Sequence, residues 1–146
     1  MKFIAVILVL ITSLSDARAA CDFDIEVGDS LVFSISEMSV ESTCEMVNIT
    51  LSHTGNMPVA AMGHNWVLAK EAEYQAIAMA GISAGVGGNY LPDGDERIIA
   101  ATKLIGGGEV TSLSFSIGNL DSSEAYAFFC SFPGHWGVMK GVFKIV

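Results

Sequence analysis

The sequence is poor in basic residues, and this scarcity limits the partners it can have. Its 146 residues include seven Lys and Arg against 16 Asp and Glu, a formal net charge of −9. A surface of this charge repels phosphate backbones, so we expect no nucleic acid partner. Repeats, low-complexity tracts and linkers are also lacking, and the length suits one domain with a real core better than two.

Cysteine and histidine are scarce as well, with three of each. Structural zinc sites normally use four Cys or His ligands at paired spacings, and iron–sulfur clusters need several cysteines, so neither kind of site is expected. Hydrolase chemistry of the Ser/His/Asp or Cys/His kind is harder to exclude from residue types alone. No oxyanion-loop motif accompanies these residues, however, which argues against it.

A long apolar run occurs only near the N-terminus. Lys2 supplies a positive start, an apolar run covers Phe3 to Ile11, and residues 17–19 form the Ala-x-Ala pattern of a cleavage site. This layout predicts a secretory signal peptide over residues 1–20. The mature domain is then 21–146, with no membrane span.

Cys21 would lie at the start of that mature domain. A lipid-modified Cys21 is the alternative to soluble export, but lipoprotein signals usually have Leu where this chain has Arg18. Residues 21–146 keep five Lys and Arg and 15 Asp and Glu, a net charge of −10. This charge is consistent either with simple solubility or with a basic protein partner.

The cysteines of an exported protein normally pair in the oxidising compartment, and an odd number leaves one over. Cys21 and Cys44 flank a stretch that can fold back on itself as a hairpin, which favours a disulfide between them. In the chain-entropy model this bond would stabilise the fold by roughly 3 kcal/mol. Cys130 is then alone, and such a thiol is either buried or bound to something.

Alternation of apolar and polar residues dominates the mature sequence. It covers residues 23–27, 31–35, 47–51 and 113–117, with turn-forming residues between these runs. Short strands at such spacing predict an antiparallel sandwich or barrel.

Residues 71–84 break this pattern. They are rich in Ala, Glu, Met and Gln, which predicts a short helix with acidic residues in its first turn. Glycines at 85, 87 and 88 are expected to end it. The segment is an excursion from the sandwich and not a second domain.

Three potential metal ligands, Cys130, His135 and Met139, lie within ten residues near the C-terminus. They fall in a loop between an apolar strand at 126–130 and a final strand, and a loop can curl its side chains around one point. His64 adds an imidazole at the start of another apolar strand. Two His, one Cys and a distant Met form the trigonal set expected of a blue-copper site.

These segments resemble those of the azurins. Residues 62–68 read Met-Gly-His-Asn-Trp-Val-Leu, and residues 128–135 read Phe-Phe-Cys-Ser-Phe-Pro-Gly-His, with Met139 four residues beyond. The Cys-x4-His-x3-Met spacing is that of azurin, and the resemblance spans nearly the whole mature chain. It implies an all-β, cupredoxin-like Greek-key sandwich or barrel with one short helical excursion around 71–84.

The resemblance also implies roles for single residues. The equatorial ligands of one copper ion would be His64, Cys130 and His135, with Met139 as the long axial ligand and the Gly63 carbonyl as a distant donor. Asn65 would tie the two ligand segments together through its side chain, and the amide of Phe132 would donate to the Cys130 sulfur. The buried core Trp would be Trp66, with a packing role.

A further set of residues matches the hydrophobic docking patch of azurins around the exposed edge of the C-terminal His. The set is Met57, Ala61, Met62, Pro133, Gly134, Trp136 and Val138. Trp136 is expected to be partly exposed and to widen the apolar rim. The alternative is ordinary apolarity of loop residues, but a contiguous exposed patch usually marks a contact surface.

The implied function is that of a one-electron carrier in the periplasm of a Gram-negative bacterium, with copper cycling between Cu(I) and Cu(II). The expected partners are redox proteins, such as c-type cytochromes, dehydrogenases or reductases, in transient contact. An enzyme is not expected, because a copper oxidase or nitrite reductase needs a second copper centre and only His53 is left unassigned. Copper storage is a further alternative. Intense thiolate-to-Cu(II) colour in the copper-loaded protein would favour the carrier over storage. Alternation directs His53 inward, as a core histidine or as a group that modulates the copper.

Overall fold

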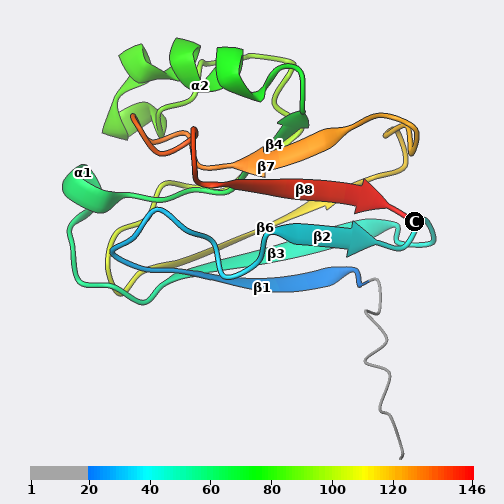
Figure 1. Cartoon of the computed structure of the whole chain (residues 1–146), viewed down its shortest axis with the longest axis horizontal. Coiled ribbons are helices and arrows are strands. Elements are labelled where there is room, and N and C mark those ends of the chain that lie inside the picture. The colour runs from blue at the N-terminus through cyan, green and yellow to red at the C-terminus, as the bar shows by residue number, and fades with distance from the viewer. Residues whose placement is uncertain (1–19) are drawn as a thin grey trace, which may run out of the picture.

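Two β-sheets pack face to face in this computed structural model, which describes residues 20–146 (Figure 1). The smaller sheet has the order β1-β3-β6, with β1 at Asp22–Val27, β3 at Met46–His53 and β6 at Val110–Ser116. The larger sheet has the order β2-β8-β7-β4-β5, with β2 at Glu37–Val40, β8 at Lys140–Ile145, β7 at Tyr126–Phe129, β4 at Val67–Lys70 and β5 at Ala100–Ala101. The all-β fold is thereby confirmed, whereas the predicted signal peptide, apart from Ala20, lies outside the described residues.

The core lies between the two sheets. Val47, Ile49 and Leu51 of β3 are all 0% exposed, as alternation predicts, and they belong to one apolar cluster with Trp66 and Phe128. Burying side chains of this size stabilises the fold by roughly 1.5–3 kcal/mol each. Trp66 is also fully buried, and its indole Nε1 has no hydrogen-bond partner among residues 20–146.

Both sheets are mixed, which corrects the antiparallel prediction. β1 pairs in parallel with β3, and β2 pairs in parallel with β8, whereas the other pairs are antiparallel. Parallel neighbours need a long crossover connection, and here the chain between β1 and β3 passes through β2 of the larger sheet. Residue periodicity cannot reveal that arrangement, since a strand alternates in the same way in either direction.

The strand expected at residues 31–35 is absent. Ser34 donates from its backbone N to Glu26 O at 2.9 Å, and the Glu26 amide donates to the Ser34 hydroxyl at 2.9 Å, so this segment folds back on β1 instead of joining a ladder. Phe33 still points inward, with 7% exposure and its ring edge-on to Phe128 at 5.4 Å. The alternation therefore indicated burial correctly and backbone pairing wrongly.

Cys21 and Cys44 form the predicted disulfide, with their Cα atoms 5.7 Å apart. The hairpin from which this pairing was argued does not form, because β1 and β2 belong to different sheets. Cys21 immediately precedes β1 and Cys44 lies between β2 and β3, so the disulfide joins the start of β1 to the connection that leads into β3, its neighbour in the smaller sheet. It stabilises the fold by constraining the unfolded chain.

The helical excursion is shorter than predicted and begins later. Helix α2 spans Tyr74–Gly81 and is followed by the 3₁₀ turns η1 (Ile82–Ala84) and η2 (Val86–Gly88), while α1 (Val59–Met62) was not predicted. The first turn of α2 contains no acidic residue, because Glu71 and Glu73 precede it. None of the helices in residues 20–146 is long and apolar enough to cross a membrane.

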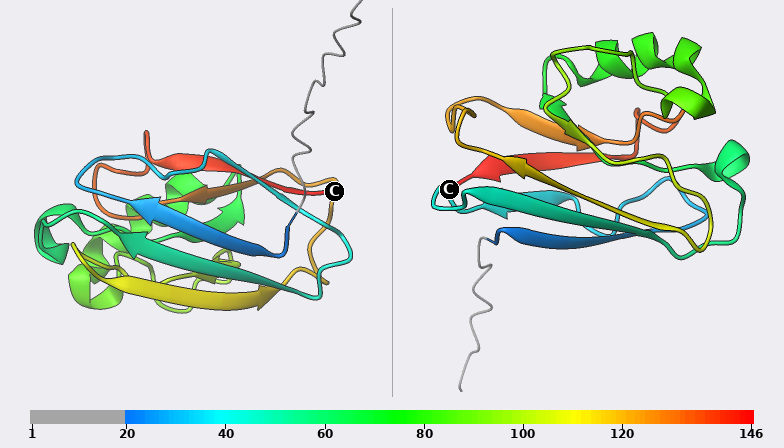
Figure 2. Two further views of the ribbon diagram at one scale, coloured as in Figure 1. Left: turned by 90° about the horizontal axis from the view of Figure 1, so that it is seen from below. Right: turned by 180° about the vertical axis from the view of Figure 1, so that it is seen from behind.

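Helix α2 covers part of the outer face of the larger sheet (Figures 1 and 2). Its Ile77 and Ala78 pack with Val67 of β4 and Phe129 of β7 in a second apolar cluster. This contact buries β7 on both faces just before the chain reaches Cys130, so the strand that carries the thiol is held from both sides.

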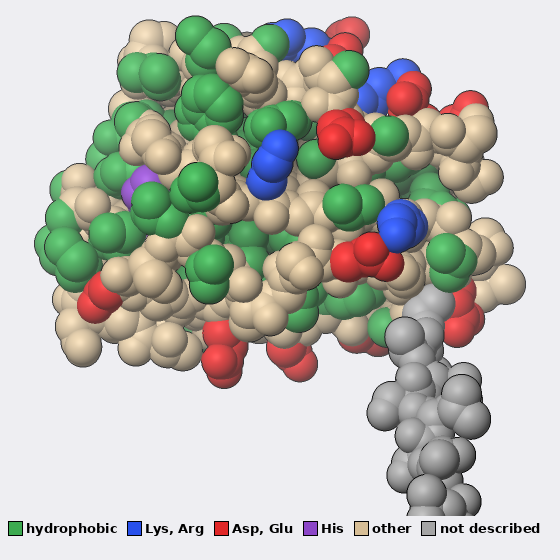
Figure 3. Space-filling view, in the orientation of Figure 1, with side chains coloured by type: hydrophobic (Ala, Val, Ile, Leu, Met, Phe, Trp, Pro, Cys, Tyr) green, Lys and Arg blue, Asp and Glu red, His purple; other side chains and the backbone are tan. Residues whose placement is uncertain are grey.

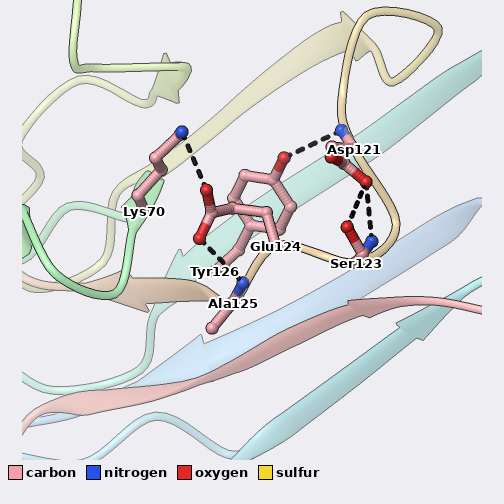
Figure 4. A network of polar contacts seen from close by, with 6 residues as sticks. All are labelled: Lys70, Asp121, Ser123, Glu124, Ala125 and Tyr126. Atoms are coloured by element: carbon pink, nitrogen blue, oxygen red, sulfur yellow. Dashed lines mark hydrogen bonds and ion pairs between the residues drawn. The ribbon is translucent and has the colours of Figure 1, made fainter.

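A polar network holds the turn that leads into β7 (Figure 4). The Asp121 amide donates to the Tyr126 hydroxyl at 3.0 Å, and Asp121 Oδ1 accepts from the Ser123 hydroxyl at 2.7 Å. Lys70 of β4 forms an ion pair with Glu124 at 2.8 Å. These contacts anchor the start of β7, whose other end leads to Cys130 and the C-terminal loop.

Candidate metal centre

Three donor atoms from two distant segments converge in the structure. His64, Cys130 and His135 are all buried, and their candidate ligand atoms lie within 4.8 Å of one another. Cys130 Sγ is 3.8 Å from His64 Nδ1 and 3.6 Å from His135 Nδ1. The spacing leaves a point between the three atoms that one metal ion could occupy.

The first segment is held by backbone pairing. His64 follows α1 and exchanges two backbone hydrogen bonds with Ile105, each 2.9 Å long. Gly63 approaches its surroundings closely, since a Cβ at this position would lie 2.5 Å from the Val59 carbonyl oxygen. The Gly63 carbonyl oxygen lies 3.9 Å from Cys130 Sγ, beside the cluster.

The second segment is a loop stabilised by its own backbone. The His135 amide donates to Phe132 O at 3.0 Å, and the Met139 amide donates to His135 O at 2.8 Å. Gly134 precedes His135 with a φ of 84°, a left-handed conformation that favours glycine. Met139 is 0% exposed and lies in the same apolar cluster as Cys130.

Hydrogen bonds account for the ring nitrogens of two of the buried histidines, His64 and His53. His64 Nε2 lies 2.9 Å from the Gly28 carbonyl oxygen, which can only accept, so Nε2 carries the proton and Nδ1 is available to a metal. His53 has both nitrogens engaged, because Nε2 donates to Met62 O at 3.0 Å and Nδ1 accepts from the Gly55 amide at 3.1 Å. His53 is thus a core histidine with satisfied hydrogen bonds, and its ring is stacked on that of His64 at 5.0 Å.

Burial sets the protonation of the cluster. Desolvation raises the pKa of the Cys130 thiol to about 11, although the nearby amide groups of Asn65 and Phe132 act in the lowering direction. Desolvation, followed by the neighbouring His64, lowers the pKa of His135 to about 4. The pKa of His64 is also lowered, chiefly by desolvation. At neutral pH both imidazoles are therefore neutral, and the thiol keeps its proton until a metal displaces it.

The Asn65 side chain joins the two ligand segments. Its Oδ1 accepts from the Ser131 amide at 2.8 Å, and its Nδ2 donates to the Ser131 hydroxyl at 2.8 Å and to the Asn89 carbonyl at 3.0 Å. Ser131, Asn89 and the Gly28 carbonyl were not predicted as part of the site. Ser131 could have been found from its place beside Cys130, but no pattern in the sequence points to Gly28 or Asn89.

The patch expected around His135 is exposed to different degrees. Val138 is 66% exposed and Met57 is 38% exposed. The others are at least partly exposed, namely Ala61, Met62, Pro133, Gly134 and Trp136. Figure 3 shows histidine surface bordered by hydrophobic side chains on this face, and His135 is the most exposed of the three histidines, at 5%. Trp136 also packs edge-on against Tyr74, with the ring centroids 6.4 Å apart.

The donor set suits copper. A thiolate favours Cu(I), whereas imidazoles accept both oxidation states. His64 presents an unprotonated Nδ1 toward a buried sulfur, His135 Nδ1 lies 3.6 Å from the same sulfur, and rigid elements hold all three groups. A β-sandwich with this cluster at one end of its strands defines a small protein of the blue-copper class.

Comparison with known proteins agrees with this class. The model of the family "Copper binding proteins, plastocyanin/azurin family" matches residues 19–146. The azurin of Achromobacter denitrificans is 47% identical over 133 residues, which are 91% of this chain and 89% of that protein. The azurin of Alcaligenes faecalis is 48% identical over 126 residues, or 86% of this chain and 98% of that protein. A solved structure of the azurin Az-iso2 from Methylomonas sp. strain J has a TM-score of 0.84 and 42% identity, covering 88% of this chain and 99% of that one.

The chain therefore belongs to the plastocyanin/azurin family of copper-binding proteins. It is an electron carrier whose cofactor is one copper ion, and its partners are redox proteins. The copper supplies the Cu(I)/Cu(II) couple, and the protein supplies the donor atoms and their rigid placement.

Proposed function

We propose that His64 Nδ1, Cys130 Sγ and His135 Nδ1 would be the main ligands of the copper ion, with Met139 and the Gly63 carbonyl as weaker donors. The observation that carries this proposal is the buried cluster of three donor atoms within 4.8 Å of one another. The hydrogen bonds of Asn65 and the amide of Phe132 support the cluster from outside, as groups around metal ligands commonly do.

His135 is the proposed route by which the electron enters and leaves. It reaches the surface at 5% exposure, whereas His64 is 0% exposed. The docking patch around it consists of Met57, Ala61, Met62, Pro133, Gly134, Trp136 and Val138. An apolar rim without charged side chains suits a small, short-lived contact of the weak-encounter kind.

The proposed setting is the periplasm of a Gram-negative bacterium, reached with a cleaved signal peptide over residues 1–20. The Cys21–Cys44 disulfide supports an oxidising compartment, where such bonds persist. The proposed partners are c-type cytochromes, dehydrogenases or reductases, and the net charge of −10 for residues 21–146 would speed capture of basic ones at low salt. The protein transfers electrons and makes or breaks no bond in a substrate, so we assign it no enzymatic activity.

Absorption spectroscopy of the copper-loaded protein tests the ligand assignment. We expect an intense thiolate-to-Cu(II) band in the visible region that disappears in Cys130→Ser. The matched control is His53→Gln, which alters a neighbouring imidazole whose two nitrogens are both hydrogen-bonded, and which should keep the band. Persistence of the band in Cys130→Ser would refute the assignment, and a colourless protein that binds only Cu(I) would indicate storage instead.

A further inference from the structure

Two consecutive residues have an unusual backbone conformation. Asn89 has a φ of 56° and Tyr90 a φ of 51°, and they are the non-glycine residues with positive φ among residues 20–146. Asn tolerates the left-handed region, but Tyr does not favour it, so the Tyr90 backbone is strained. A turn of this kind persists because its surroundings hold it in place.

Contacts hold this turn from three sides. The Asn89 carbonyl accepts from Asn65 Nδ2 and from the Ser131 hydroxyl, both at 3.0 Å. The Asn89 side chain accepts from the Leu104 amide at 2.9 Å. On the side of α2, Gly81 lies so close to the Tyr90 carbonyl that a Cβ would collide with it. The end of the helical excursion is thereby tied to both ligand segments.

The conformation of the turn directs the Tyr90 ring toward the site. The ring lies edge-on to Phe132, with the centroids 5.1 Å apart and an interplanar angle of 71°. Phe132 in turn lies over His135, with the centroids 4.4 Å apart. Three rings therefore run in sequence from the excursion to the most exposed imidazole of the cluster.

We propose that Tyr90 is a positioning residue for His135, acting through the ring of Phe132. The proposal rests on the proposed function in that His135 is a copper ligand. Phe132 is only half buried, so its own packing restricts its ring incompletely. To keep the His135 imidazole in place, the Phe132 ring needs a further contact. Tyr90 supplies that support, because its backbone is fastened to Asn65 and Ser131 through Asn89.

The expected consequence concerns the order of the imidazole. Without the Tyr90 ring, Phe132 gains rotational freedom and the His135 ring can tilt away from Cys130 Sγ, from which its Nδ1 is 3.6 Å distant. If the imidazole is mobile in the copper-free protein, metal binding must fix its orientation, and that entropic cost weakens the affinity. Loss of outer partners of metal ligands typically costs 10–100-fold in affinity, so we expect about tenfold faster copper loss.

The experiment compares ring-removing and ring-keeping variants. Tyr90→Leu and Tyr90→Met remove the ring, whereas Tyr90→Phe keeps it and should rescue. The matched control is Phe23→Leu, a half-buried aromatic at the end of β1 remote from Gly28. The first readout is the set of NMR resonances of the His135 ring in the copper-free protein, and the second is the rate of copper loss to a chelator.

A double-mutant cycle with Phe132→Leu tests whether the two rings act in series. We expect Tyr90→Leu and Phe132→Leu each to broaden or split the His135 resonances and to speed copper loss, and the double variant to add nothing further. Tyr90→Phe and Phe23→Leu should match the wild type. Equal behaviour of Tyr90→Leu and Tyr90→Phe, or multiplying effects in the double variant, would overturn the proposal. Failure of the proposed function would instead appear in the wild type, as absence of the thiolate-to-Cu(II) band.

Discussion

The amide of Cys130 donates to the carbonyl of Met139 at 3.1 Å. This single backbone hydrogen bond joins the first and the last candidate ligands of the C-terminal loop. The residues between them must then curl, and His135 faces Cys130 Sγ across the loop. The approach of His135 to Cys130 therefore follows from how β7 and β8 meet.

Val138→Asp tests the docking patch. Val138 is 66% exposed beside the site, and a carboxylate there should repel a second copy of the protein at the moment of electron exchange. We expect the self-exchange rate to fall about tenfold at low salt, because like charges facing each other cost free energy at a contact. The rate is measured by NMR line broadening in mixtures of reduced and oxidised protein. Val146→Asp adds the same charge at a 60% exposed position at the opposite end of the molecule (Figure 1), and an equal loss in both variants would contradict the patch.

Met139→Leu tests axial ligation. The substitution conserves volume, so the copper-free protein should lose less than about 1.5 kcal/mol of stability. The reduction potential should rise, because removing a weak donor disfavours Cu(II) more than Cu(I). Voltammetry measures the potential, and Met38→Leu is the control, since both methionines are 0% exposed. Equal potentials in the two variants would leave Met139 as a packing residue.

Copper uptake should release protons in a defined number. With a thiol pKa of about 11, Cys130 is protonated at pH 7, whereas His135, with a pKa of about 4, is already neutral. We expect about one proton released per Cu(II) at pH 7, because the thiolate is the ligand. Calorimetry in buffers of different ionisation enthalpy counts these protons. Cys130→Ser should release none under the same conditions, and a count near two in the wild type would place a proton on one of the imidazoles.

Asp95 makes folding stability depend on pH in acid. A hydrogen bond from Arg97 lowers the pKa of Asp95 from 3.8 to about 2. A carboxyl group with a lowered folded-state pKa stabilises the fold above its unfolded pKa, and this contribution disappears as the pH falls through the folded value. Wild type should therefore exceed Asp95→Asn in stability above pH 3.8, and the difference should vanish toward pH 2. Urea unfolding across this range measures it, with Glu96→Gln as the neighbouring charge control.

Much of the core and of the ligand cluster was predictable, because both depend on side-chain type and spacing. Alternation placed Val47, Ile49 and Leu51 inside, and the loop between two strands brought Cys130 and His135 together. The disulfide was predicted correctly from a hairpin that does not exist. Its cysteines meet because β1 and β3 are parallel neighbours in one sheet, and only the spatial order of the strands reveals that.

What escaped prediction depends on backbone groups and long-range pairing. The Gly28 carbonyl that selects the His64 tautomer, and the Asn89 carbonyl that holds Asn65, carry no residue-type signal. Residues 31–35 alternate like a strand, yet they join no ladder, and Ser34 instead forms hydrogen bonds with Glu26. The helix was predicted to begin at residue 71, because Glu71 and Glu73 have good helical propensity. In the structure both residues lie in a turn, and α2 begins three residues later, at Tyr74.

The two tryptophans of this chain have contrasting surroundings, and that difference supplies an internal pair of fluorescent reporters. Trp66 is fully enclosed, and its indole N–H has no hydrogen-bond partner among residues 20–146, so solvent relaxation cannot shift its emission to long wavelength. Trp136 is partly exposed beside His135, where water shifts the emission to longer wavelength. Unfolding of the sandwich should therefore change the short-wavelength emission, which comes from Trp66. Contact of a partner with the copper end should change the long-wavelength emission, which comes from Trp136.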